Sequence, residues 1–298
     1  MKLCASIEIQ EGLSYPDTLS LARAAEESGY DAALLAEHYA ASSGFPDRSA
    51  SDAWVFLGAL ARDTRRIRLG TLVSPVTFRH PSVIAKLAAS LDNLSDGRAE
   101  LGLGAGWLEA EHEAYGFPFP AAKERVDLLE EQLKVIAGLW SGRTFSHTGA
   151  RYRLRDCTFT PAPVQQPHPP LIVGGRPTSR RLPRLAARHA DEYVVSLPTA
   201  DECESVAQVL EGRCDLSVFT YACVAETEAE ADRIHRRTTA ALRPEMRQTK
   251  RWIFGTQSSA REYLDGMAAA GVARVFVAVW DECHAETIQA LAACNRSG

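Results

Sequence analysis

Short apolar runs of strand length alternate with stretches of helical period along most of the chain. The expected strands are residues 3–9, 32–36, 67–73, 99–103, 171–173, 193–196, 216–224 and 272–280. The stretches between them are amphipathic, and in 81–94 the apolar side chains recur at helical spacing: Ile84, Leu87, Leu91 and Leu94. Nearly continuous apolar strands separated by helices are typical of parallel sheets covered on both faces. We therefore expect an α/β fold, a (β/α)8 TIM barrel formed as one domain by residues 1–298, with an open doubly wound sheet as the alternative.

Residues 143–170 interrupt this alternation. A small hairpin is expected around Thr148 and Gly149, and the sequence P-A-P-V-Q-Q-P-H-P-P follows at 161–170. Proline at this density is incompatible with a central strand or a helix interior. We expect an insertion, placed after the fourth strand and its helix, that lies over the mouth of the barrel, because long loops are usually functional. The alternative is an inert connector.

Composition narrows the possible partners and the compartment. A net charge of -5 and a pI near 5.9 leave no broad basic surface, so we expect no nucleic-acid partner. No run reaches the roughly 20 apolar residues of a membrane span, and the first residues lack the pattern of a secretory leader. The seven cysteines are scattered, without a C-x-x-C pair. A reduced, cytoplasmic location fits this usage best.

Glycines stand where two expected strands end, which is where ligands bind in parallel sheets. Gly102, Gly104 and Gly106 are spaced as G-x-G-x-G, which is not the G-x-G-x-x-G of a dinucleotide fold. We interpret them as small residues that let a flat ring lie against the backbone. Gly174 and Gly175 link a strand to a helix and form a candidate phosphate site, to which nearby side chains contribute a charge and hydroxyls: Arg176, Thr178 and Ser179. A simple tight turn with a helix cap at Thr178 is the alternative.

Titratable residues also follow the second strand. His38 comes directly after Glu37 there, so its imidazole could exchange a proton with a substrate near neutral pH, and a structural histidine is the alternative. A second acidic group includes one histidine: Glu109, Glu111, His112 and Glu113. The metal motif H-E-x-x-H needs another histidine at position 116, which is Gly116, so we expect a helix start there and no metal site.

Five stretches resemble the luciferase-like monooxygenase superfamily, specifically the branch that uses the deazaflavin coenzyme F420. They are A-E-H at 36–38, L-G-T-L-V-S-P-V-T-F-R-H-P at 69–81, L-G-L-G-A-G-W-L-E-A-E-H-E-A-Y-G at 101–116, E-R-V-D-L-L-E-E-Q-L-K-V-I-A-G-L-W at 124–140, and P-P-L-I-V-G-G at 169–175. Together they span most of the chain in the same order, and the third stretch is the most specific.

The resemblance implies a barrel with a cofactor at the carboxyl ends of its strands, and it assigns residues to that cofactor. A bulge in the third strand would flank the ring, with a non-prolyl cis peptide at Leu72–Val73: Gly70, Thr71, Leu72 and Val73. The other side would be lined by Gly104, Ala105 and Gly106. The phosphate would be bound by Gly174, Gly175 and Thr178, with the charge of Arg176 nearby. His38 falls where related deazaflavin enzymes carry an active-site histidine.

Two positions depart from relatives. Flavin-using members often carry an arginine for the FMN phosphate where this chain has Ala105, which favours the deazaflavin. Some sugar-phosphate-oxidising relatives carry a catalytic glutamate where this chain has Trp107, so their substrate cannot be transferred to it.

The resemblance implies an F420-dependent oxidoreductase. It would pass a hydride between F420 and a small organic substrate with an activated C=C, C=N or C=O bond, with His38, assisted by Glu37, handling the proton. The alternatives are an FMN-dependent monooxygenase, a non-catalytic F420-binding protein and a metal-dependent barrel hydrolase. Relatives are often dimers, so a homodimer is expected.

Overall fold

The structure is a computed structural model that describes residues 1–42, 47–239, 251–279 and 284–295. Eight parallel strands form a closed barrel: β1 (Lys2–Ile7), β2 (Ala32–Leu35), β3 (Arg68–Pro75), β4 (Ala99–Gly104), β7 (Leu171–Gly175), β8 (Glu192–Ser196), β9 (Asp215–Val224) and β11 (Arg274–Val279). The strands pair in the order β9-β11-β1-β2-β3-β4-β7-β8, and β8 pairs back to β9, which closes the ring. The expected (β/α)8 barrel is confirmed.

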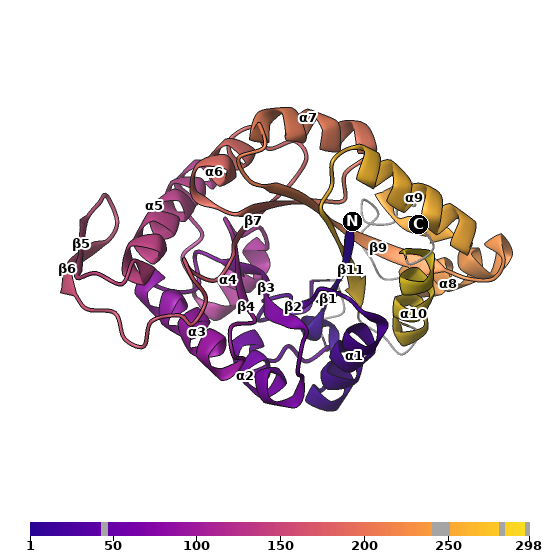
Figure 1. Ribbon diagram of the computed structural model, residues 1–298, viewed down its shortest axis with the longest axis horizontal. Helices are drawn as coiled ribbons and strands as arrows, with labels where there is room; N and C mark the ends of the chain where they lie inside the picture. The colour runs from indigo at the N-terminus through magenta and orange to yellow at the C-terminus, as the bar shows by residue number, and fades with distance from the viewer. Residues whose placement is uncertain (43–46, 240–250, 280–283, 296–298) are drawn as a thin grey trace.

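Helices surround the strands, as Figure 1 shows. They are α1 (Tyr15–Ser28), α2 (Ala53–Asp63), α3 (Pro81–Leu94), α4 (Glu109–Tyr115), α5 (Ala122–Trp140), α6 (Leu182–His189), α7 (Ala200–Leu210), α8 (Glu228–Thr239), α9 (Gln257–Ala269) and α10 (His284–Asn295). Their ends follow local chemistry: Ser14 and Asp17 form a capping box on α1, and Gly29 ends that helix with φ 83°. In the parts of the chain that the structure describes, every helix is too short or too polar to span a bilayer.

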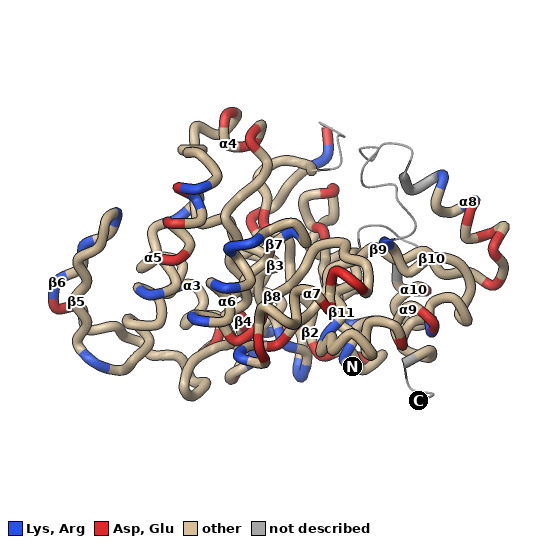
Figure 2. Tube along the Cα trace, turned by 90° about the horizontal axis from the view of Figure 1, so that it is seen from above, with Lys and Arg blue, Asp and Glu red and all other residues tan. Residues whose placement is uncertain are grey.

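Helix α4 lies over the carboxyl end of the barrel. It overlies the strands in Figure 1 and stands at the end opposite the N-terminus in Figure 2. Side chains of α4 contact the loops after β2 and β3: Glu111 contacts His38 and Tyr39, and His112 contacts Thr77.

The observed elements depart from the expected ones at the first strand and at one additional short strand. The first strand ends at Ile7, because residues 9–11 turn into a 3-10 helix, Ile9–Glu11. A short strand that the sequence did not predict, β10 (Ile253–Gly255), pairs with β9 outside the barrel. Trp280 and residues 240–241, which were included in an expected strand and helix, lie outside the described residues.

The insertion does not lie over the mouth, so that expectation was wrong. Its hairpin, β5 (Phe145–Thr148) and β6 (Arg153–Cys157), packs beside α5 and projects sideways in Figure 2. The proline-rich segment crosses the opposite, amino-terminal end of the barrel. There Val164 and Gln165 donate backbone N–H groups to Asp92 at 2.7 and 2.9 Å, and the Gln165 amide reaches the carbonyl of Ala99 at the start of β4. The segment thus donates hydrogen bonds to the Asp92 carboxylate and to a backbone carbonyl at that end.

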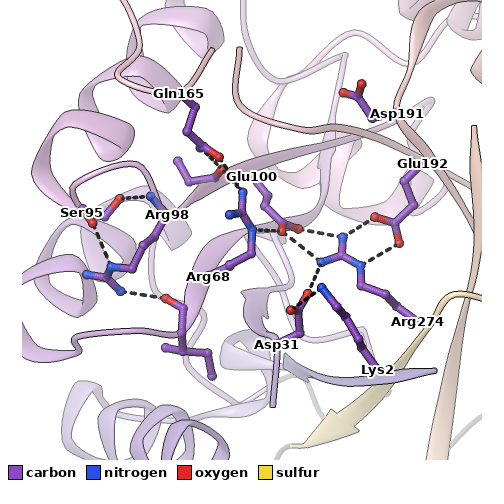
Figure 3. A network of polar contacts seen from close by, with 12 residues as sticks. Lys2, Asp31, Arg68, Ser95, Arg98, Glu100, Gln165, Asp191, Glu192 and Arg274 are labelled. Atoms are coloured by element: carbon purple, nitrogen blue, oxygen red, sulfur yellow. Dashed lines mark hydrogen bonds and ion pairs between the residues drawn. The ribbon is translucent and has the colours of Figure 1, made fainter. Parts of the chain in front are cut away.

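An ion-pair network closes the same amino-terminal end from inside (Figure 3). Arg274, the first residue of β11, donates to Glu100 of β4 and to both carboxylate oxygens of Glu192 at the start of β8. Arg68 binds Glu100 from the other side, and Asp31 completes the ring of charges. These ion pairs serve stability, since ligands of such barrels bind at the other end.

Candidate active site

The third strand contains the expected bulge. Pairing between β3 and β4 shifts between Thr71 and Ser74, and the peptide Leu72–Val73 is cis, as the resemblance implied. Leu72 and Val73 are partly exposed, while Thr71 and Ser74 on either side of them are buried. The bulge therefore leaves two apolar side chains accessible in an otherwise buried strand.

The glycines around the bulge make room for it. A Cβ at Gly104 would lie 2.6 Å from Val73 Cγ2, and one at Gly174 would lie 3.0 Å from Val73 Cγ1. At Gly70 and Gly102 a Cβ would overlap a carbonyl oxygen of the neighbouring strand, of Glu100 and of Thr71 respectively. The strand-four glycines were expected to expose bare backbone to a flat ring. In the structure, Gly104 is small because Val73 occupies that space, so the accessible surface here belongs to the bulge.

Beyond β4 the chain leaves the barrel through Ala105 and Gly106. Gly106 has φ 79°, a left-handed conformation that favours glycine. Trp107 follows and is 43% exposed. Its ring contacts the imidazole of His38 edge to face, with centroids 5.7 Å apart.

His38 is held at the carboxyl end of β2. Its Nδ1 lies 2.9 Å from Oε1 of Glu111, a buried residue in the first turn of α4. Burial alone lowers the pKa of His38, but the hydrogen bond and charge of Glu111, with the charges of Glu8 and Glu11, raise it above the ordinary value. His38 is therefore more readily protonated than an ordinary histidine.

Glu37 points into a separate network. Its carboxylate forms an ion pair with Arg79 and accepts hydrogen bonds from Ser74 of the bulge and from the indole of Trp54. Burial raises its pKa, an effect that Arg79 and Ser74 oppose. No direct contact between Glu37 and His38 occurs among the described side chains, so the two neighbours in sequence have different surroundings. Glu37 stabilises the bulge through its hydrogen bond from Ser74.

Glu8, whose charge acts on His38, was not predicted from the sequence as a functional residue. It follows β1, is 9% exposed, and accepts hydrogen bonds from Ser6 at 2.9 Å and from Gln10 at 2.8 Å. Burial raises its pKa to about 7, and the hydrogen bonds and His38 only partly oppose this. Residue 8 was included in an expected apolar strand. A lone carboxylate near the carboxyl end of that strand was the available signal.

The turn after β7 carries the residues expected to bind phosphate. Arg176 and Thr178 are exposed, and no described residue forms an ion pair with Arg176. Helix α6 starts only at Leu182, so Thr178 does not cap it. The backbone amides of the first turn of α6 therefore come several residues after Gly174 and Gly175. Gly175 packs over Tyr193, whose buried hydroxyl has no hydrogen-bond partner among the described residues.

In the acidic group around His112, the histidine ring is bound by neighbouring protein groups. His112 is buried, with Nδ1 2.8 Å from the carbonyl of Leu108 and Nε2 2.7 Å from the Thr77 hydroxyl, so both ring nitrogens are engaged. Within the described ranges, no three His, Cys, Asp or Glu side chains are grouped as metal ligands. Helix α4 does begin at Glu109, as expected.

The family follows from comparison with known proteins. The model of the luciferase-like monooxygenase family matches residues 3–290. The chain belongs to the luciferase-like monooxygenase family. The family comprises oxidoreductases and monooxygenases that use a flavin or deazaflavin.

Relatives of this family member are named for both kinds of cofactor. An F420-dependent glucose-6-phosphate dehydrogenase of Microbacterium testaceum is 36% identical over 174 residues, 58% of this chain and 50% of that relative. An FMNH2-dependent dimethylsulfone monooxygenase of Pseudomonas putida is 28% identical over 232 residues, 76% of this chain and 62% of the relative. The chain thus matches about half to two thirds of the length of these curated relatives.

Solved structures agree with the fold. An F420-dependent secondary alcohol dehydrogenase in complex with an F420–acetone adduct superposes with a TM-score of 0.81 at 17% identity, covering 98% of this chain and 97% of the other. A monooxygenase from Streptomyces bottropensis gives a TM-score of 0.82 at 22% identity, covering 98% of both chains. At such identities the likeness extends to the barrel alone.

Proposed function

We propose that this protein is an F420-dependent oxidoreductase that reduces, or in reverse oxidises, a small organic substrate at a C=C, C=N or C=O bond. The observation that carries the proposal is the protonatable His38, held by Glu111 near the bulge of β3. Reducing such a bond takes one hydride and one proton. A bound reduced deazaflavin supplies the hydride.

The residues present fit such a cofactor. The bulge offers two accessible apolar side chains, Leu72 and Val73, to a planar ring. The exposed Arg176 guanidinium and Thr178 hydroxyl suit an anionic tail. Ala105 carries no charge for an FMN phosphate in the strand-four run, which favours the deazaflavin.

His38 handles the proton in this proposal. It donates a proton to the substrate atom that becomes negative as the hydride arrives, and then regains one from water. Glu37 takes no direct part and holds Ser74 and Arg79 in place. A single general acid contributes about 100-fold to 10,000-fold, so the larger part of the rate comes from orienting the two reactants.

The decisive experiment is titration of the purified protein with F420 and with FMN, followed by fluorescence quenching. We expect tighter binding of F420. Turnover is then measured with reduced F420, and His38→Ala should reduce kcat at least 100-fold with unchanged cofactor affinity. Unchanged turnover in that variant would remove the catalytic role of His38, whereas F420 binding without any turnover in the unaltered protein would leave a cofactor-binding protein.

The second candidate is an FMN-dependent monooxygenase, favoured by the longer match to the dimethylsulfone monooxygenase. It requires tight FMN binding and oxygen consumption during turnover, which the same titration and an oxygen electrode measure respectively.

We also propose a cytoplasmic homodimer, tested by fractionation of the source cells and by sedimentation of the purified protein.

A further inference from the structure

Glu111 binds one short segment of the chain through both of its carboxylate oxygens. Oε1 contacts Nδ1 of His38 at 2.9 Å, and Oε2 accepts the backbone N–H of Tyr39 at 3.0 Å. The residue is 1% exposed and sits in the first turn of α4, 73 positions away from His38. The sequence suggested only an acidic residue at a helix start.

An acidic residue that only favours the start of a helix can remain in solvent, whereas the Glu111 carboxylate is buried. A desolvated carboxylate needs a charged or hydrogen-bonded partner, and the ionisable partner that Glu111 has among the described side chains is His38. Its neighbours Glu109 and Glu113 on the same helix are exposed and form no such contact with a described residue. The contact therefore joins α4 specifically to the loop after β2.

The contact fixes where protons reside on the imidazole. An ionised carboxylate accepts and never donates, so Nδ1 carries a hydrogen in both charge states of His38. The exchangeable proton is then on Nε2, which has no hydrogen-bond partner among the residues described. The edge contact with Trp107 limits rotation of the same ring.

We infer that Glu111 is a positioning residue that keeps Nδ1 of His38 protonated, so that Nε2 is the atom that gives a proton to the substrate. The inference rests on the proposed function for its catalytic meaning, but not for its geometry. Proton transfer breaks the Nε2–H bond and forms a bond from hydrogen to the substrate atom that becomes negative, and water returns a proton to Nε2.

The acidic groups that face His38 come from three elements. They are Glu8 after β1, Glu11 in the 3-10 helix and Glu111 in α4. Glu11 is engaged by Arg48 and Ser42, and Glu8 by neutral donors, whereas Glu111 alone touches the ring. Removing the charge of Glu111 should therefore lower the pKa of His38 more than removing the charge of Glu8 or Glu11.

The test begins with the unaltered protein without cofactor, labelled with 15N-histidine. Above the titration midpoint of His38, its nitrogen shifts should report a protonated Nδ1 and a bare Nε2. The opposite tautomer would overturn the inference, whatever cofactor the protein uses. This measurement needs no variant, so a folding defect cannot obscure it.

Glu111→Gln then removes the charge while keeping an oxygen that can accept from Nδ1. We expect the midpoint of His38 to fall by about one to two pH units, and the alkaline limb of the kcat profile to fall with it. Glu109→Gln, on the same helix and exposed, is the matched control and should shift neither. An unchanged midpoint in Glu111→Gln contradicts the inference. A shifted midpoint without any F420-dependent turnover supports Glu111 as the positioning residue and refutes the proposed function instead.

Discussion

Arg274 at the amino-terminal end of the barrel offers the sharpest test of the energetics. Its guanidinium donates to Glu192 through Nε and Nη2 and to Glu100 through Nη1 and Nη2, in the network of Figure 3. Glu100 and Glu192 are 1% and 5% exposed. Replacing Arg274 by methionine keeps an apolar side chain of similar length but removes every one of these contacts.

The expected loss follows from which partner each carboxylate keeps. Glu100 retains its ion pair with Arg68, whereas no other cation described in the structure contacts Glu192. Breaking a buried pair by removing one partner typically costs about 3–5 kcal/mol, because a buried charge is left uncompensated. The loss should be larger at pH 8 than at pH 5, since burial already raises the pKa of Glu192 and protonation removes the unpaired charge.

Equilibrium unfolding in urea, followed by tryptophan fluorescence, measures this loss. Lys2→Met is the matched control, because Lys2 contacts Asp31 of the same cluster at 2.8 Å but its side chain is 65% exposed. Exposed pairs contribute about 0–1 kcal/mol. A loss in Arg274→Met no larger than that in Lys2→Met, or one independent of pH, would refute the reasoning.

Three further outcomes are expected. Because its pKa is raised in the folded state, protonated Glu8 stabilises the fold at low pH, and about 3 kcal/mol of unfolding free energy should be lost between pH 4.5 and 7. In Glu8→Gln this loss should be absent. Identical urea midpoints of both proteins across that range would disprove the expectation. Gly102→Ala should cost about 1–3 kcal/mol by overlap with the Thr71 carbonyl, whereas Gly58→Ala, in open space within α2, should gain up to about 1 kcal/mol in the same assay. Arg176→Ala should weaken F420 binding about 10-fold to 100-fold in the fluorescence titration, and an unaltered affinity counts against a phosphate site there.

Much of the fold was readable from local pattern. The strand that became β3 was predicted from its apolar run at 67–73, although it continues through Ser74 to Pro75, and the helix α3 was predicted from its periodic apolar stripe. The cis peptide at Leu72–Val73 was predicted from resemblance, since no local preference of leucine or valine indicates one. The strand β10 escaped because three residues are too few for a periodicity to show.

The insertion shows the limit of such prediction. Its proline content correctly excluded a strand or helix interior, but nothing in the composition says toward which end of a barrel it runs. Asp92 and the carbonyl of Ala99 decide that, because they accept the N–H groups of Gln165 at the amino-terminal end. Both acceptors lie more than 60 residues away in sequence.

The sequence by itself determined the alternation of buried strands and amphipathic helices, since side-chain periodicity follows directly from backbone geometry. It also identified His38 at the end of a strand. Only the tertiary structure decided which carboxylate serves that histidine. The adjacent Glu37 is bound to Arg79 and Ser74, while Glu111 arrives from another helix. Such pairings depend on distances between segments far apart in the chain, which closure of the barrel sets and local sequence does not encode.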